Sequence, residues 1–171
     1  MAQRAIERPP LIAVCGISRS DEHTDELAER VGGLVSARGG IVVCGGLGGV
    51  MAAAARGAKR AGGLSIGLLP GDDASDAAPD VSLAIPTGLG EGRNLLIVRA
   101  CAALIAIGGA YGTLSEIALA LRLGKRVVGL STWSIQPPGG QIDDPAILRA
   151  ETADDAVRIA FEALERRPVP V

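Results

Sequence analysis

The stretch "ALIAIGGAYGTLSEIALALRLGK", residues 103–125, contains the patterns that decide the fold of this chain. Residues 103–107 are aliphatic without a polar interruption, which is typical of a strand buried on both faces. Two glycines follow, and residues 113–125 then place Leu114, Ile117 and Leu121 on one face of a helix. The stretch therefore predicts a buried strand, a glycine turn and a helix.

The same order of strand, turn and helix recurs along the chain. Further strands are predicted at residues 11–16, 41–46, 64–70, 81–88 and 126–131. Further helices are predicted at residues 25–40, 48–63, 92–102 and 152–167, with breaker-rich loops at residues 71–80 and 133–146. Apolar strands that alternate with helices indicate an α/β fold, a Rossmann-like three-layer sandwich whose parallel sheet has helices on both faces.

The composition favours a single packed domain over residues 1–171. The chain is 48% hydrophobic, and 17 basic and 19 acidic residues give a net charge of −2. The basic residues are scattered, so no broad footprint for a nucleic-acid backbone is visible. No signal peptide is predicted, because residues 1–10 lack an apolar core. No membrane span is predicted, because the apolar region at residues 95–107 is short and contains Arg99. We expect a cytoplasmic protein with flexible ends at residues 1–9 and 167–171.

The cysteines and the histidine do not indicate a metal site. Cys15, Cys44 and Cys101 are isolated in apolar surroundings and are expected to be buried free thiols. His23 is the only histidine, and it precedes a predicted helix. No nucleophile elbow of a Ser-His-Asp hydrolase lies nearby, so we expect His23 to be solvated rather than catalytic. Lys59 and Lys125 are both expected at helix ends, and neither is expected to form a Schiff base with a cofactor.

Two glycine turns, residues 44–51 and 107–116, open helices at the same predicted edge of the sheet. Neither matches the dinucleotide fingerprint or the Walker pattern, so NAD-dependent redox chemistry and P-loop hydrolysis are not predicted. Free amides at a helix N-terminus attract anions, and glycine allows an anion to approach them. The turns and their neighbours therefore predict a phosphate or ligand site formed by Gly16, Ser18, Gly45, Gly46, Gly48, Gly49, Arg93, Asn94, Gly109, Tyr111, Gly112 and Thr113.

Glu116 and Arg93 each have two interpretations. A carboxylate beside a ribose can stabilise an oxocarbenium-like state or activate water, which would make Glu116 catalytic. Thr113 and Glu116 also have the spacing of a capping box, in which the glutamate bonds to its own helix start. Arg93 is either a solvated residue of a first helical turn or the partner of an anion or carboxylate. Arg99 interrupts an apolar face, so we expect an acidic partner in the core or at a subunit contact.

Residues 108–116 resemble the P-G-G-x-G-T-x-x-E hallmark of the LOG-like (SLOG) superfamily. Gly109, Gly112, Thr113 and Glu116 match, whereas Gly108 and Ala110 replace a proline and a glycine. Upstream, the chain keeps the family arginine as Arg93, has Asn94 in place of the family lysine, and has Arg99 at a second arginine. The resemblance covers nearly the whole chain.

The resemblance implies a pocket for a phosphorylated ligand. The superfamily includes cytokinin-riboside-monophosphate phosphoribohydrolases, some formerly described as lysine decarboxylases, an activity that we do not predict here. "GEGRN" and "GGAYGTLSEIALAL" are closer to the branch that contains molybdenum-cofactor carrier proteins. We therefore expect binding of a nucleotide-like ligand or cofactor, such as a nucleotide or the molybdenum cofactor, with no cofactor required. A nucleoside 5′-monophosphate phosphoribohydrolase using Arg93 and Glu116 is the alternative.

The resemblance has two further implications. The DNA-processing protein DprA is a more distant relative, which makes nucleic-acid binding a third hypothesis, and the net charge of −2 argues against it. Family resemblance also implies a homodimer or a larger homo-oligomer.

Overall fold

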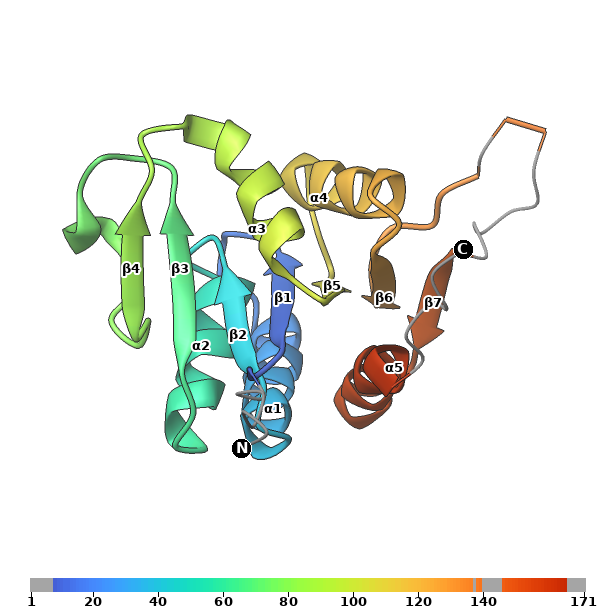
Figure 1. The fold of residues 1–171 in the computed structure, drawn as a ribbon, viewed down its shortest axis with the longest axis horizontal. Coiled ribbons are helices and arrows are strands. Elements are labelled where there is room, and N and C mark those ends of the chain that lie inside the picture. Colours follow the sequence, from blue (N-terminus) through green and yellow to red (C-terminus); the bar gives the residue numbers. More distant parts are fainter. Residues whose placement is uncertain (1–7, 137, 140–145, 166–171) are drawn as a thin grey trace, which may run out of the picture.

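The computed structural model describes residues 8–136, 138–139 and 146–165. The described strands form one seven-stranded sheet in the order β4-β3-β2-β1-β5-β6-β7, and each neighbouring pair is parallel. Figure 1 shows how these strands lie side by side. The strands are β1 (Leu11–Gly16), β2 (Ile41–Cys44), β3 (Ser65–Leu69), β4 (Leu83–Pro86), β5 (Ala103–Ile107), β6 (Arg126–Leu130) and β7 (Ile147–Ala150). The predicted Rossmann-like α/β fold is confirmed.

Helices cover both faces of the sheet (Figure 1). The α-helices are α1 (Glu22–Ala37), α2 (Val50–Arg60), α3 (Asn94–Ala100), α4 (Tyr111–Arg122) and α5 (Ala153–Glu165), and the 3-10 helices are η1 (Ala74–Asp76) and η2 (Gly90–Arg93). Ile12 and Val14 of β1 join the core under α1, α2 and α5, whereas Ala13 and Cys15 join the core under α3 and α4. This alternation explains why the strand is apolar at every position.

The order of the strands creates a crevice at the edge of the sheet where the parallel strands end. The chain moves outward from β1 through β2 and β3 to β4, and then returns to place β5 on the other side of β1. The connections after β1 and β5 therefore diverge, and ligands of such sheets bind at this switch point.

The structure corrects the sequence analysis at three places. Strand β7 was not predicted; it is an edge strand of four residues in which exposed Arg149 interrupts the apolar pattern. Helix α4 begins at Tyr111 rather than Thr113. Of its predicted inner face, Ile117 is buried and Leu121 packs against the core, whereas the buried Thr113, Glu116 and Ala120 were not predicted to belong to that face. The predicted helix at residues 92–102 is η2 followed by the shorter α3.

Some predictions fall on parts of the chain that are not described. Of the ends predicted to be flexible, residues 1–7 and 167–171 lie outside the described residues, and so do residues 137 and 140–145 of the predicted loop. None of the helices within the described ranges combines the length and the apolar run that crossing a bilayer requires.

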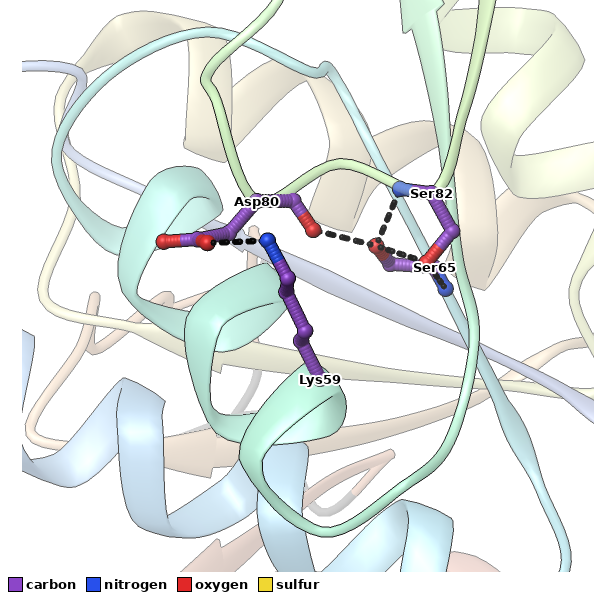
Figure 2. A network of polar contacts seen from close by, with 4 residues as sticks. All are labelled: Lys59, Ser65, Asp80 and Ser82. Carbon is purple, nitrogen blue, oxygen red and sulfur yellow. Dashed lines mark hydrogen bonds and ion pairs between the residues drawn. The ribbon is translucent and has the colours of Figure 1, made fainter.

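Polar contacts connect the start of β3 and the end of α2 to residues 80–82, just before β4 (Figure 2). The Ser65 amide donates to Ser82 Oγ at 3.1 Å, and the Ser82 amide donates to Ser65 Oγ at 3.1 Å.

Lys59 Nζ, in the last turn of α2, pairs with Asp80 Oδ1 at 3.0 Å. Lys125 Nζ donates to the Cys101 carbonyl oxygen at 2.8 Å, just after α3. Both lysines thus lie at helix ends, as expected.

Helices α1 and α2 contact each other through their backbones. A Cβ atom at Gly32 would lie 2.0 Å from the Ala54 carbonyl oxygen, and one at Gly57 would lie 1.8 Å from the Glu29 carbonyl oxygen. At the neighbouring Gly33 the nearest atom would be the Gly57 carbonyl oxygen at 3.5 Å, an ordinary contact. The glycine pair in α1 is therefore asymmetric: one position has no room for a methyl group and the other has.

We expect Gly32→Ala to lower the free energy of unfolding by about 2–3 kcal/mol, because the added methyl group must push two helices apart. Gly33→Ala is expected to raise it by about 0.5–1 kcal/mol, since alanine is the better helix former and meets no close atom. Urea unfolding of the two variants measures both changes. Equal effects at the two positions would contradict the backbone contact between α1 and α2.

Candidate functional site

A cavity of about 330 Å³ lies at the switch point between β1 and β5. The segments after β1, β2, β3 and β5 contribute to it, together with η2 and the start of α3. It is lined by Gly16, Ile17, Ser18, Leu47, Met51, Pro70, Glu91, Arg93, Asn94, Ala110, Gly112, Thr113 and Glu116. The structure thus brings together Gly16, Ser18, Arg93, Asn94, Gly112, Thr113 and Glu116 from the predicted set.

The remaining predicted residues do not line this cavity: Gly45, Gly46, Gly48, Gly49, Gly109 and Tyr111. A Cβ atom at Gly45 would lie 2.0 Å from Arg93 Nη1, so this glycine leaves room for the guanidinium group. Gly49 has a φ of 59°, and a Cβ atom there would lie 2.3 Å from the Ile17 carbonyl oxygen. The first glycine turn therefore supports the cavity wall and positions Arg93.

Part of the cavity lining was not predicted from the sequence. Ile17, Leu47, Met51 and Pro70 are apolar, and a pattern alone does not separate such residues from the core. Glu91 lies in η2, whose 3-10 form was not predicted. The available signal was proximity in sequence, since Ile17 lies between the predicted Gly16 and Ser18.

The N-terminus of α4 supplies hydrogen-bond donors to the cavity. Ala110 is the N-cap without a side-chain hydrogen bond, and the Leu114 amide is bonded to the Ala110 carbonyl oxygen at 3.0 Å. The amides of residues 111–113 precede that bond and have no acceptor within the helix. The Thr113 hydroxyl is buried without a partner, in a residue that is 2% exposed. An acceptor-rich anion would satisfy these donors.

Glu116 is not a helix cap. It lies six residues after the N-cap Ala110, whereas a capping box places the glutamate three residues after the cap. Its side chain is buried and lines the cavity. Burial raises the pKa of this carboxyl from 4.5 to about 7, against the charge of Arg93 and a hydrogen bond with the Cys15 thiol, which lower it. The capping interpretation is therefore wrong. The cavity instead contains a buried carboxyl group whose pKa is raised to about 7.

Arg93 is buried as well, so its interpretation as a solvated residue is wrong. Its Nη1 donates to the Leu68 carbonyl oxygen at 2.8 Å, and its Nε is buried without a partner in the described part of the chain. Burial lowers the pKa of the guanidinium group, and the charge of Glu116 raises it. The two residues influence each other electrostatically but form no ion pair within the described parts of the chain. The guanidinium group therefore retains donors for a ligand.

Asn94 and Arg99 have different surroundings. Asn94 Nδ2 donates to Ser115 Oγ at 3.2 Å, and Ser115 Oγ donates to the Gly112 carbonyl oxygen at 2.7 Å. This chain of bonds connects α3 to the first turn of α4. Arg99 is exposed and pairs with no acidic residue in the described part of the chain, so the expected partner in the core is wrong. A subunit contact for Arg99 stays a prediction.

The thiols and the histidine are placed as expected. Cys15, Cys44 and Cys101 are free and buried, and His23 is exposed. Burial raises the pKa of Cys15 well above its usual value, and the Glu116 charge adds to this shift. Within the described ranges, no group of three histidine, cysteine, aspartate or glutamate side chains could hold a metal ion.

Comparisons with known proteins agree with the fold and the resemblance. A protein of Archaeoglobus fulgidus, described as uncharacterised, is 46% identical over 128 residues, which are 74% of this chain and 80% of that protein. The molybdenum cofactor binding protein of the phototrophic bacterium Rippkaea orientalis has a TM-score of 0.81 at 31% identity, covering 92% of this chain and 99% of that one. The molybdenum cofactor carrier protein of Chlamydomonas reinhardtii has a TM-score of 0.80 at 33% identity, covering 93% and 100%.

A more distant likeness concerns the fold alone. DNA processing protein A of Helicobacter pylori has a TM-score of 0.66 at 16% identity, covering 90% of this chain and 81% of that one.

The model of the SLOG cluster4 family matches residues 9–160, which is most of the chain. This match shows that the chain belongs to the SLOG cluster4 family.

Proposed function

We propose that this protein binds a phosphorylated, nucleotide-like ligand or cofactor in the cavity at the switch point and acts as its carrier. The observation that carries the proposal is a pair of buried donors without partners, the Thr113 hydroxyl and Arg93 Nε, in two residues that line the same cavity. Buried polar atoms in native proteins nearly always have partners, so an unpaired pair of donors beside a helix N-terminus supports a binding site for an anion.

The molybdenum cofactor is the specific ligand that the relatives suggest. The similar proteins of Rippkaea orientalis and Chlamydomonas reinhardtii bind or carry this cofactor. The residues of the cavity fit a phosphorylated group, because Arg93, Thr113 and the amides at the start of α4 are all donors. These groups would hold and orient the phosphate, while the apolar Ile17, Leu47 and Met51 would exclude water beside it.

Calorimetric titration with ribose 5-phosphate and with ribose tests the phosphate site. We expect ribose 5-phosphate to bind and ribose not to bind. Thr113→Val is expected to weaken ribose 5-phosphate binding by about tenfold, because a hydrogen bond to a charged group is lost. The same change leaves the unfolding free energy of the free protein unchanged or higher, since valine has no hydroxyl to desolvate. Equal binding of the two sugars would contradict the proposal.

One observation favours an enzyme as the second candidate. Glu116 and Arg93 line one cavity, and the pKa of the Glu116 carboxyl lies at about 7, which suits proton transfer. A nucleoside 5′-monophosphate phosphoribohydrolase would use water to cleave the N-glycosidic bond, giving ribose 5-phosphate and the free base. Release of adenine from AMP by the wild type, and its loss in Glu116→Gln, would support this function. Bound AMP that stays intact would exclude AMP as its substrate.

Self-association belongs to the same proposal. Leu83 and Ile85 of β4 and Leu95 and Leu96 of α3 are exposed, as a homodimer or a larger homo-oligomer would require of a contact surface. The expected cytoplasmic location and the disfavoured binding of single-stranded DNA also stay predictions.

A further inference from the structure

A second cavity, of about 360 Å³, lies next to the first one. It is lined by Gly108, Gly109, Ser131, Thr132 and Trp133. Gly109 lines this cavity, and the next residue, Ala110, lines the first one. Adjacent Cα atoms are only about 3.8 Å apart, so the two cavities approach each other at these residues. The turn before α4 therefore borders both cavities.

Two of the three aromatic residues of the chain meet beside this second cavity. The sequence has one Trp, one Tyr and one Phe. The rings of Tyr111 and Trp133 have centroids 5.8 Å apart and planes inclined by 35°. Tyr111 is 80% exposed, whereas Trp133 is partly buried against the core, so the pair presents to solvent mainly the ring of Tyr111. Packing of the protein itself does not account for this exposure.

The aromatic pair is held in place by hydrogen bonds. Trp133 Nε1 donates to the Ala110 carbonyl oxygen at 3.2 Å, and the Trp133 carbonyl oxygen accepts from Arg149 Nη1 at 2.8 Å. Thr132 Oγ1 donates to the Gly108 carbonyl oxygen. Ser131 has a φ of 51°, a left-handed backbone that only Ser131 adopts among the described non-glycine residues. Such backbone conformations persist where the surroundings enforce them, often at binding sites.

We propose that Tyr111, Trp133 and the second cavity form a subsite for the flat ring of the ligand, a fused nitrogen heterocycle of the purine or pterin class. This inference rests on the proposed function, because the phosphate of the same ligand lies in the first cavity. The ring stacks on the exposed aromatic surface, and the Ser131 hydroxyl and the backbone of Gly109 lie in reach of its polar edge. Base–aromatic stacking tolerates different bases, so the subsite selects a flat ring rather than one particular heterocycle.

Fluorescence of Trp133 reports on this subsite directly, because it is the only tryptophan of the chain. The probes are AMP and GMP, with ribose 5-phosphate as the matched ligand that lacks a ring. GMP is included because its six-membered ring has the amino and carbonyl pattern of a pterin. We expect AMP or GMP to quench Trp133 and to bind about tenfold more tightly than ribose 5-phosphate, which binds without quenching.

Two variants of Tyr111 separate the ring from the phosphate. Tyr111→Ala is expected to lower the affinity for the quenching nucleotide by about tenfold and to leave that for ribose 5-phosphate within about twofold. Tyr111→Phe keeps the ring and is expected to bind as the wild type does. If ribose 5-phosphate binds but neither nucleotide quenches Trp133 or gains affinity, the inference is overturned and the phosphate site stands. If none of the three binds, the inference and the proposed function are both overturned.

Discussion

Glu116→Gln is expected to raise the free energy of unfolding by about 3 kcal/mol at a pH of about 8. Burial raises the pKa of the Glu116 carboxyl from 4.5 to about 7, so the folded protein resists the charged form. Glutamine has nearly the same shape, carries no charge, and keeps an oxygen that accepts from the Cys15 thiol. A substitution in the cavity would then stabilise the protein, which is typical of residues retained for function at the expense of stability.

The pH dependence of this effect has a definite sign. The pKa of Glu116 is higher in the folded protein than in the unfolded chain, so the folded state binds the proton more tightly. The stabilising contribution is therefore complete below pH 4.5 and is lost as the pH rises through about 7. We expect the wild type and Glu116→Gln to be about equally stable near pH 4, and to diverge between pH 4.5 and about 7.

Urea unfolding of both proteins across this pH range measures the difference. Glu91→Gln is the matched control, because Glu91 lines the same cavity but is exposed. Its substitution is expected to change the unfolding free energy by no more than about 0.5 kcal/mol at any pH. A Glu116→Gln protein that is less stable than the wild type at about pH 8 would show that the carboxylate has a structural role instead.

The parts of the site that were predictable from sequence are those that depend on local pattern. Apolar strands and glycine turns placed Gly112 and Thr113 at the C-terminal edge of the sheet, because parallel strands all end there. The role of Glu116 was not predictable, since its spacing from Thr113 fits a cap and a buried carboxyl equally well. The start of α4 at Tyr111 decided between the two, and that start depends on the extended backbone of Ala110.

Features that depend on long-range contacts also escaped prediction. Trp133 lay in a predicted loop, and only the return of β6 beside β5 brings it to Tyr111. Gly45 was predicted to touch the phosphate, whereas its position against the Arg93 guanidinium group follows from two segments that are distant in sequence. A glycine in a turn therefore indicates that another group approaches the backbone closely, but it does not tell whether that group belongs to a ligand or to the protein.

Arg93→Met is expected to weaken the binding of ribose 5-phosphate by about 100-fold, the largest effect on binding that we expect of a single substitution. Arg93 supplies a buried positive charge, and its Nε is a donor without a partner among the described residues. Methionine keeps much of the apolar stem and removes the charge. Arg93→Lys is expected to lose about tenfold, because an ammonium group lacks the planar fork that can bond to Leu68 and the phosphate together.

The same substitution has a second readout that does not need a ligand. The Arg93 charge lowers the pKa of Glu116, so its removal is expected to raise that pKa above about 7. The pH range in which the protein loses stability should then extend upward in Arg93→Met and stay in place in Arg93→Lys, which retains the charge. Calorimetric titration gives the affinities, and urea unfolding at several pH values gives the shift. A normal affinity in Arg93→Met together with a shifted pH range would mean that Arg93 serves Glu116 alone and does not hold the phosphate.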